Sequence, residues 1–320
     1  MLLDVTLRDG GYLNEWAFSR AQMHLATEYA IAGGADFVEI GYVDDRAGLP
    51  AAASLDTSVL EDFQRYREKA GLVVMCRPSV EDSLAVLHNR RSLIDLVRIP
   101  VDLRMPELAA RLAAVCASLD MPFTYNLTNI SCYSDAKIAA AFELLPDKAV
   151  VTYIADSRGS LRPEHIPNIY RVLRSVRDTV LGFHAHNNLG LACENTLAAL
   201  EAGAQWIDGS LLGIGLGGRN LDLADAVDLA LPFRSDLSAV PLPDNVHAFD
   251  FGVPPPGDEM DMYLLTGQKN FKMEWAMMMD ETIGREATCT IIRSLPDIVM
   301  FRLEELKAFV QEEIWNKLRW

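Results

Sequence analysis

Two stretches far apart in the chain hold residues that can bind a divalent metal. Gly182 to Asn188 reads GFHAHNN, and Leu7 to Gly10 reads LRDG. If the apolar run from Val180 to Phe183 is a β-strand, His184 and His186 project to the same side, because strand side chains two apart share a face. Two imidazoles held in this way, with a carboxylate from elsewhere, form a divalent-metal site. The alternative is a pair of core or surface histidines.

The elements that position these residues alternate along the chain. From residue 2 to about 231, short apolar β-type runs alternate with helical patterns. Such β–α units in one domain predict an α/β fold, a (β/α)8 TIM barrel, with a doubly wound sheet as the alternative. The predicted strands are Leu2–Arg8, Phe37–Tyr42, Leu72–Cys76, Leu93–Ile99, Pro122–Asn126, Ala149–Ala155, Val180–Ala185 and Trp206–Leu212. The predicted helices cover residues 19–32, 58–70, 80–90, 105–119, 135–145, 163–177, 191–202 and 221–231. Ser19 with Gln22 and Ser58 with Glu61 have the spacing of capping boxes.

The C-terminal ends of the strands carry the active site in such barrels. The polar residues predicted there are Arg8, Asp9, Glu39, Arg77, Arg98, Asn126, Asp156, Ser157, His184, His186 and the run Gly213–Asn220. Asp9 ends strand one and the histidines end strand seven, on either side of strand eight, so the three side chains can converge. Asn220 can add an amide oxygen. This donor set suits Mn²⁺, Mg²⁺ or Zn²⁺ as a Lewis acid, which would stabilise the enolate of a 2-oxo acid.

Arg8 is adjacent to the predicted metal ligand. Its permanent charge can stabilise a developing enolate or alkoxide oxygen; alternatively it only pairs with Asp9 or Glu39. Glu39 is expected to orient its neighbours rather than bind the metal. No lysine stands at the end of a predicted strand, which argues against Schiff-base chemistry.

More arginines are predicted on the same face of the barrel than the metal site needs. Arg77 and Arg98 end neighbouring strands, and Arg158 and Arg219 lie in later loops. A buried guanidinium needs a partner, so we expect an anionic or strongly polar second substrate. The alternative is pairing with internal carboxylates such as those of Asp102 and Asp156.

Residues 233–320 are predicted to form a separate C-terminal extension of the barrel, which occupies residues 1–232. Pro241 to Gly257 carries five prolines and is typical of a linker or wrapping arm. Helical patterns follow at 258–268, 273–283 and 298–317. Several methionines give this tail an adaptable apolar surface, which suits a helical layer packed on the barrel or, alternatively, the interface of a homo-oligomer.

Composition limits the classes of partner. The chain has 320 residues, 50% of them hydrophobic, with a net charge of −16. This acidity argues against nucleic acid and anionic membranes as main partners. No stretch approaches the roughly 20 apolar residues that a membrane-spanning helix needs. The five cysteines are scattered without C-x-x-C spacing, and no cleavable leader is recognisable, so we expect a soluble protein of the reducing cytoplasm.

Five motifs together resemble one superfamily. DVTLRDGG, VEIGY, ADSRG, GFHAHNNLG and GIGLGGRN are similar to the DRE-TIM metallolyases, also called HMGL-like proteins, which include 4-hydroxy-2-oxovalerate aldolases, 3-hydroxy-3-methylglutaryl-CoA lyases and 2-isopropylmalate synthases. The resemblance covers residues 2 to about 231. It implies a barrel whose metal is held by Asp9, His184 and His186, with Asn220 binding or orienting the metal. It also places the catalytic arginine at Arg8 and the strand-two glutamate at Glu39.

Within the superfamily the motifs are most similar to the aldolase branch. ADSRG resembles the A-D-S-G-G of aldolases, which implies that Ser157 helps to hold a pyruvate carboxylate, and Asn126, Arg77 and Arg98 are expected to contact substrate as well. Where aldolases have a histidine that is a candidate proton carrier, this chain has Tyr12. Tyr12 is expected to act as an acid or base with a pKa lowered by the metal, or else to form only a wall.

The resemblance therefore implies a class II, metal-dependent aldolase that acts through a pyruvate-type enolate on a polar or anionic aldehyde, with Mn²⁺ as the expected metal. The alternatives are a Claisen-type enzyme that condenses an acyl-CoA with a 2-oxo acid and an HMG-CoA-lyase-like enzyme. A non-catalytic barrel that serves as a scaffold or binding subunit is a further alternative.

Overall fold

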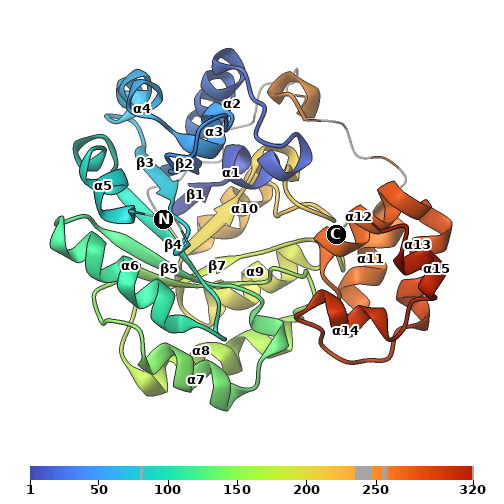
Figure 1. Ribbon diagram of the computed structural model, residues 1–320. Helices are drawn as coiled ribbons and strands as arrows, with labels where there is room; N and C mark the ends of the chain where they lie inside the picture. The colour runs from blue at the N-terminus through green and yellow to red at the C-terminus, as the bar shows by residue number, and fades with distance from the viewer. Residues whose placement is uncertain (80–81, 235–246, 254–256, 258, 319–320) are drawn as a thin grey trace.

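The barrel prediction is confirmed. The structure, a computed structural model, describes residues 1–79, 82–234, 247–253, 257 and 259–318. Eight parallel strands form a closed barrel in sequence order, and β1 pairs with both β2 and β8 (Figure 1). The strands are β1 (Leu2–Asp4), β2 (Phe37–Tyr42), β3 (Gly71–Met75), β4 (Leu96–Val101), β5 (Phe123–Leu127), β6 (Val151–Ala155), β7 (Leu181–His184) and β8 (Ala204–Gly209). Among the described residues, no helix is long and apolar enough to cross a membrane.

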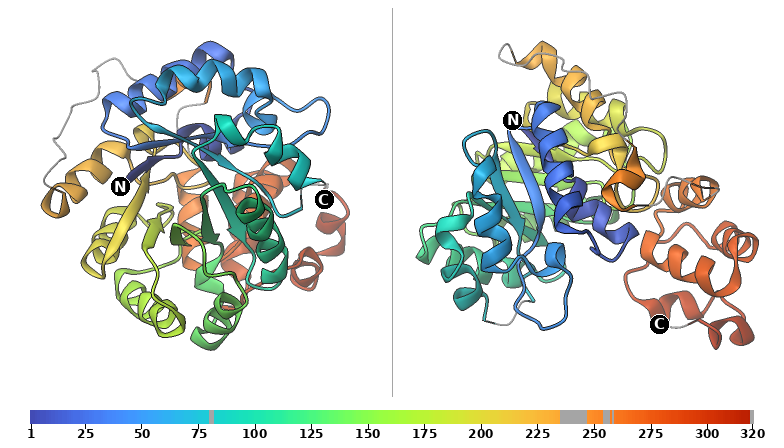
Figure 2. Two further views of the ribbon diagram at one scale, coloured as in Figure 1. Left: turned by 90° about the vertical axis from the view of Figure 1, so that its left-hand side faces the viewer. Right: turned by 90° about the horizontal axis from the view of Figure 1, so that it is seen from above.

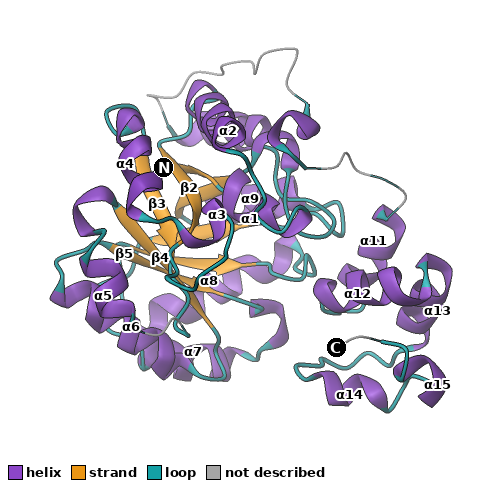
Figure 3. Ribbon diagram, turned by 45° about the horizontal axis from the view of Figure 1, so that its top comes forward, coloured by secondary structure: helices purple, strands orange, loops and turns teal. Residues whose placement is uncertain are grey.

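Helices surround the barrel and bury its outer face (Figure 3). They are α1 (Thr6–Gly10), α2 (Arg20–Ala32), α3 (Ala51–Ser54), α4 (Thr57–Phe63), α5 (Ser83–His88), α6 (Pro106–Ser118), α7 (Asp135–Glu143), α8 (Ile166–Val176), α9 (Ala192–Glu201) and α10 (Leu223–Ala230). The capping box of Ser19 and Gln22 is confirmed at α2. The box predicted at Ser58 is wrong, because Asp56 caps α4 by accepting a hydrogen bond from the backbone N–H of Val59 at 2.9 Å.

Several strand boundaries differ from the prediction by a few residues, and the differences in β1 and β4 affect the site. β1 ends at Asp4, and the LRDG motif lies in the short helix α1 instead of on the strand. β4 continues through Pro100 to Val101, where Pro100 is still paired with Asn126 of β5. Arg98 therefore lies within its strand and not at the end, which directs its side chain into the barrel.

The interior of the barrel has its own apolar cluster. Leu3, Val73, Val151 and Tyr153 pack together there, although they come from strands on different sides of the barrel. The guanidinium carbon of Arg98 lies 4.3 Å from the centre of the Tyr153 ring. The apolar cluster thus lies inside the barrel beneath the charged residues of the site, and Arg98 packs against it.

The C-terminal extension lies beside one end of the barrel and, in the left view of Figure 2, behind it. It comprises α11 (Met260–Gln268), α12 (Met273–Ile283), α13 (Arg285–Ser294), α14 (Leu303–Lys307) and α15 (Glu312–Trp315). The single helix predicted at 298–317 is wrong: α14 and α15 are separate, and α13 was not predicted. Met262, Met279 and Ile292 are buried in the extension's own core. The prolines predicted to form the linker lie outside the described residues.

Candidate metal centre and active site

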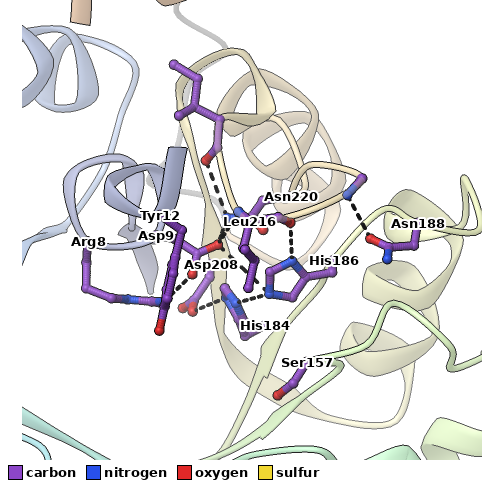
Figure 4. A network of polar contacts seen from close by, with 12 residues as sticks. Arg8, Asp9, Tyr12, Ser157, His184, His186, Asn188, Asp208, Leu216 and Asn220 are labelled. Atoms are coloured by element: carbon purple, nitrogen blue, oxygen red, sulfur yellow. Dashed lines mark hydrogen bonds and ion pairs between the residues drawn. The ribbon is translucent and has the colours of Figure 1, made fainter. Parts of the chain in front are cut away.

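Three buried side chains bring potential metal ligands together (Figure 4). One ligand atom each from Asp9, His184 and His186 lies within 4.8 Å of the others. Asp9 comes from α1, His184 ends β7, and His186 follows two residues later. The predicted convergence of strands one and seven therefore occurs, although the aspartate is on a helical turn after the strand.

Second contacts fix which nitrogen of each histidine faces the centre. Nδ1 of His186 lies 3.1 Å from the carbonyl oxygen of Leu216, and Nδ1 of His184 lies 2.9 Å from a carboxylate oxygen of Asp208. A carbonyl or carboxylate oxygen only accepts, so these contacts favour the tautomers that carry hydrogen on Nδ1. In those tautomers the two Nε2 atoms, 3.3 Å apart, have lone pairs available for a metal. Burial lowers the pKa of His186 to about 4, which keeps the imidazole in the neutral, metal-binding form.

Asn220 contacts Asp9 beside the two histidines. The amide nitrogen of Asn220 donates to Asp9 at 2.8 Å, while its Oδ1 is buried without a hydrogen-bond partner among the described residues. Burial works to raise the pKa of Asp9, but Arg8, the two histidines and the hydrogen bond from Asn220 together outweigh burial and hold that pKa below its usual range. Asn220 fits closely against Gly215, where an added Cβ would lie 2.3 Å from its amide nitrogen. Two imidazoles, a carboxylate and an unsatisfied amide oxygen fit a divalent metal.

A buried network of charges supports this donor set. Glu39 accepts from Nε of Arg8 at 2.9 Å and from Nη1 of Arg98 at 3.3 Å. Nη2 of Arg98 donates to Asp208 at 2.6 Å and to Asn126 at 3.2 Å. The chain Arg8–Glu39–Arg98–Asp208 thus runs through the barrel to His184.

This network differs from one predicted role. Arg98 was expected to contact substrate, but it is 0% exposed, is held by Glu39 and Asp208, and does not line the cavity above the donor set. Glu39, predicted as a catalytic residue that orients its neighbours, is likewise 0% exposed and lies beneath the cavity, where it contacts Arg8 and Arg98. The carboxylates that pair with Arg98 are Glu39 and Asp208, not the predicted Asp102 or Asp156.

A cavity of about 410 Å³ opens above the donor set. Arg8, Tyr12, Arg77, Asn126 and Ser157 line it together with the three potential ligands. This volume is in the range of sites that bind small molecules. The structure therefore brings most of the predicted site residues to one cavity.

The polar groups of this wall are set up to donate hydrogen bonds. Oγ of Ser157 accepts from the backbone N–H of Asn129 at 2.9 Å, which leaves its own hydrogen for a ligand. Oδ1 of Asn126 is occupied by Arg98, so its free function is the amide N–H₂. The hydroxyl of Tyr12 lies 3.2 Å from that of Tyr42. Burial, together with Tyr42, raises the pKa of Tyr12 well above its usual value, whereas the prediction concerned the lowering effect of a bound metal.

Comparison with known proteins agrees with these motifs. Residues 107–240 match the family HMGL-like. Over 224 residues the chain is 30% identical to a 4-hydroxy-2-oxovalerate aldolase from Pelotomaculum thermopropionicum, covering 68% of this chain and 66% of the aldolase. Over 248 residues it is 29% identical to an oxaloacetate decarboxylase from Mycobacterium tuberculosis, covering 76% of this chain and 73% of the decarboxylase. The chain belongs to the HMGL-like family. It spans about two thirds of the length of the aldolase that it matches.

Solved structures show the same fold as this HMGL-like chain. The N-terminal domain of a proposed aldolase from Bacteroides vulgatus superimposes with a TM-score of 0.70 at 23% identity, covering 92% of this chain and 99% of that one. The carboxyl transferase domain of Rhizobium etli pyruvate carboxylase gives a TM-score of 0.58 at 15% identity, covering 93% and 61%. At these identities the likeness concerns the fold alone.

Two residues of the site in this HMGL-like chain were missed in the sequence. Asp208 orients His184, and the signal for it was an acidic residue within the apolar strand sequence WIDG, since a buried carboxylate needs a partner. Lys272 of the extension lines the cavity. No local signal marks it, because its place depends on how the extension packs against the barrel.

Proposed function

We propose that this protein is a divalent-metal-dependent carbon–carbon lyase of the aldolase type, acting on a pyruvate-type 2-oxo acid. The main support is the arrangement of donors: ligand atoms of Asp9, His184 and His186 converge on one buried point at the cavity, and Asn220, which contacts Asp9, has an unsatisfied Oδ1. A divalent cation held there, for which we propose Mn²⁺, supplies a Lewis acid that stabilises negative charge on an enolate oxygen.

Arg8 and Ser157 have complementary roles in this proposal. Nη2 of Arg8 is buried and has no hydrogen-bond partner among the described residues. It can donate to the oxygen on which charge develops, and Glu39 holds it in place from behind. The hydroxyl of Ser157 is free to donate to the carboxylate of the 2-oxo acid. Together these residues bind and orient the substrate at both of its oxygen-bearing groups.

Tyr12 is the proposed proton donor. With its pKa raised by burial, the phenol is neutral at physiological pH, so it carries a proton that it can donate and does not serve as a base. An aldol cleavage needs a base for the substrate hydroxyl, whereas decarboxylation of a 2-oxo diacid needs only protonation of the enolate carbon. Because Tyr12 can donate a proton, its protonated state favours β-decarboxylation as a second candidate reaction, in line with the similarity to an oxaloacetate decarboxylase.

Arg77 supports an anionic partner for the enolate. It lines the cavity, and its guanidinium carbon lies 3.7 Å from the centre of the Tyr42 ring. Among the described residues it has no carboxylate within ion-pair distance, in contrast to Arg98. A carboxylate or phosphate of the substrate would complete its contacts.

The proposal predicts metal-dependent formation of aldol products. The protein, incubated with Mn²⁺, pyruvate and a panel of aldehydes, should give products detectable by mass spectrometry, and EDTA should abolish them. Borohydride added during turnover should leave the protein mass unchanged, because no imine forms. Borohydride is a necessary control, since Lys272 lies in the cavity wall; a trapped adduct on a lysine would contradict the proposal. Oxaloacetate offered alone tests the second candidate through release of CO₂.

We also propose a homo-oligomer and a cytoplasmic location, both on sequence grounds. Met260 and Leu264 of α11 are 37% and 39% exposed, which supports a contact surface on the extension. Met277 and Met278, by contrast, pack against the core of the extension and are poorly suited to an interface.

A further inference from the structure

The C-terminal extension forms part of the wall of the cavity. Lys272, Glu274 and Phe301 line it opposite the residues of the barrel. Lys272 directly precedes α12, and Glu274 lies in the first turn of that helix. The side chains available to a second substrate therefore depend on where the extension is held.

Arg158 fastens the extension to the barrel. Its side chain is 2% exposed and follows β6, next to Ser157. It donates to the backbone carbonyl of Asn270, to that of Met300 at 2.9 Å, and to Oδ1 of Asn129 at 3.2 Å. Asn270 has a left-handed φ of 47° and stands two residues before Lys272, so this contact fixes the start of α12 relative to the site.

Neighbouring loops reinforce the same junction. Nδ2 of Asn270 donates to the carbonyl of Ser131 at 3.1 Å, and the hydroxyl of Ser131 donates back to Oδ1 of Asn270 at 3.0 Å. Nδ2 of Asn188, after β7, donates to the hydroxyl of Thr266 in α11 at 2.9 Å. Three loops of the barrel thus hold the segment that presents Lys272.

The cations that line the cavity differ in whether the protein neutralises them. Arg8 pairs with Asp9 and Glu39, and Arg104 makes a two-pronged contact with Asp102. Within the part of the chain that the structure describes, neither Arg77 nor Lys272 has a carboxylate within ion-pair distance. Each lies against an aromatic ring instead: Nζ of Lys272 is 5.5 Å from the centre of the Trp275 ring.

We infer that Lys272 of the extension, together with Arg77 of the barrel, binds an anionic group at the far end of the second substrate. The inference rests on the proposed carbon–carbon lyase activity and names the class of its acceptor. Arg77 offers a planar fork of donors and Lys272 a point charge, and both suit a carboxylate or a phosphate. The negative charge of Glu274, in the same wall, repels such an anionic group and lowers the affinity of the site for it.

Comparing two aldehydes of four carbons separates the effect of a substrate's charge from the effect of its size. Succinic semialdehyde carries a distal carboxylate, and butanal is its neutral counterpart. With pyruvate as the donor, Lys272→Met should raise KM for succinic semialdehyde roughly 10-fold or more, the usual loss for a hydrogen bond to a charged group, while kcat and all constants for butanal change little. Lys272→Arg should restore most of the loss, and Glu274→Gln should lower KM for the charged aldehyde. Equal effects of Lys272→Met on both aldehydes would overturn the inference.

A binding measurement keeps the inference testable if neither aldehyde reacts, an outcome that would contradict the proposed activity alone. Succinate and inorganic phosphate are titrated separately into wild-type protein and Lys272→Met by calorimetry. The wild type should bind at least one of them several-fold more tightly than the variant. Lys307→Met is the matched control, because Nζ of Lys307 lies 5.8 Å from the ring centre of Trp315 in the same extension but outside the cavity. Equal affinities of all three proteins for both anions would overturn the inference.

Discussion

The two histidines of the donor set are held by partners of different charge. His184 faces the carboxylate of Asp208, whereas His186 faces the neutral carbonyl of Leu216. A carboxylate behind an imidazole makes it a more basic ligand and fixes its ring more firmly than a carbonyl does. Asp208 is itself held by Arg98, so the orientation of His184 depends on the charge network beneath the cavity.

At this scale we predict that His184→Ala and His186→Ala each lose stoichiometric metal while the barrel stays folded. Each substitution removes one of two imidazole ligands, and the remaining donors are too few for tight binding. Metal content after dialysis, measured by mass spectrometry, together with circular dichroism, checks the result. His24→Ala is the control, since His24 lies on α2 with Asp62 and Tyr66, away from the cavity. Full metal content in both site variants would rule out this metal centre.

Sequence reasoning at the residue scale succeeded where a motif specified the role and failed where burial decided it. Asp9, His184 and His186 were identified from spacing and resemblance, and they converge. Arg98 was misjudged because its strand was predicted to end at Ile99, whereas the strand continues to Val101 and the guanidinium lies in the interior. The burial of Tyr12 and its contact with Tyr42, which raise its pKa, could not be predicted, because Tyr42 is distant in sequence.

Among the elements, the loop after β6 contains a carboxyl group that should make stability depend on pH. Oδ1 of Asp156 accepts from the backbone N–H groups of Ser160 and Leu161 at 2.9 and 3.1 Å. Burial nevertheless raises its pKa to about 7. The folded state therefore binds this proton more tightly than the unfolded state, so the stabilisation is complete below about pH 4 and is lost as the pH rises through 7.

Asp156→Asn should consequently gain stability relative to the wild type between pH 5 and pH 8. Asparagine keeps the accepting Oδ1 and carries no charge, and the expected gain is at most on the order of 1.4 kcal/mol per pH unit up to pH 7. Urea unfolding at both pH values measures it. In Asp56→Asn, where the N–H of Val59 lowers the carboxyl pKa, the difference from the wild type should be the same at both values. A pH-independent difference for Asp156→Asn would contradict the raised pKa.

The elements themselves were predictable to different degrees. The alternation of β-type and helical patterns was sufficient for the barrel, because it repeats with every unit. The helices of the extension were predicted less well: Gly284, with a φ of 83°, separates α12 from α13, and short connections divide the last predicted helix. These short helices are stabilised by packing in a shared core and not by a strong periodic pattern, so the sequence alone gave little sign of them.

On the scale of the whole molecule, the protein has a barrel core and a second core in the extension. The contacts between the two include hydrogen bonds of Arg158, Asn188 and Asn270 and the stacking of Tyr133 on Phe301. We propose that barrel and extension are separate structural units joined at the mouth of the site. A junction that lies outside both cores opens at a lower cost in free energy than either core unfolds.

Arg158→Ala should therefore loosen the extension without unfolding the barrel. The substitution removes the donors that hold the carbonyls of Asn270 and Met300, and each such bond to a charged group contributes about 1.5–3 kcal/mol. Hydrogen exchange followed by mass spectrometry should show amides of α11 and α12 exchanging roughly 10-fold faster or more, with β-strand amides unchanged. Arg219→Ala is the control, because Arg219 donates to the carbonyl of Leu212 within the barrel. Protection of α11 and α12 equal to that of the wild type would mean that Arg158 does not hold the extension over the site.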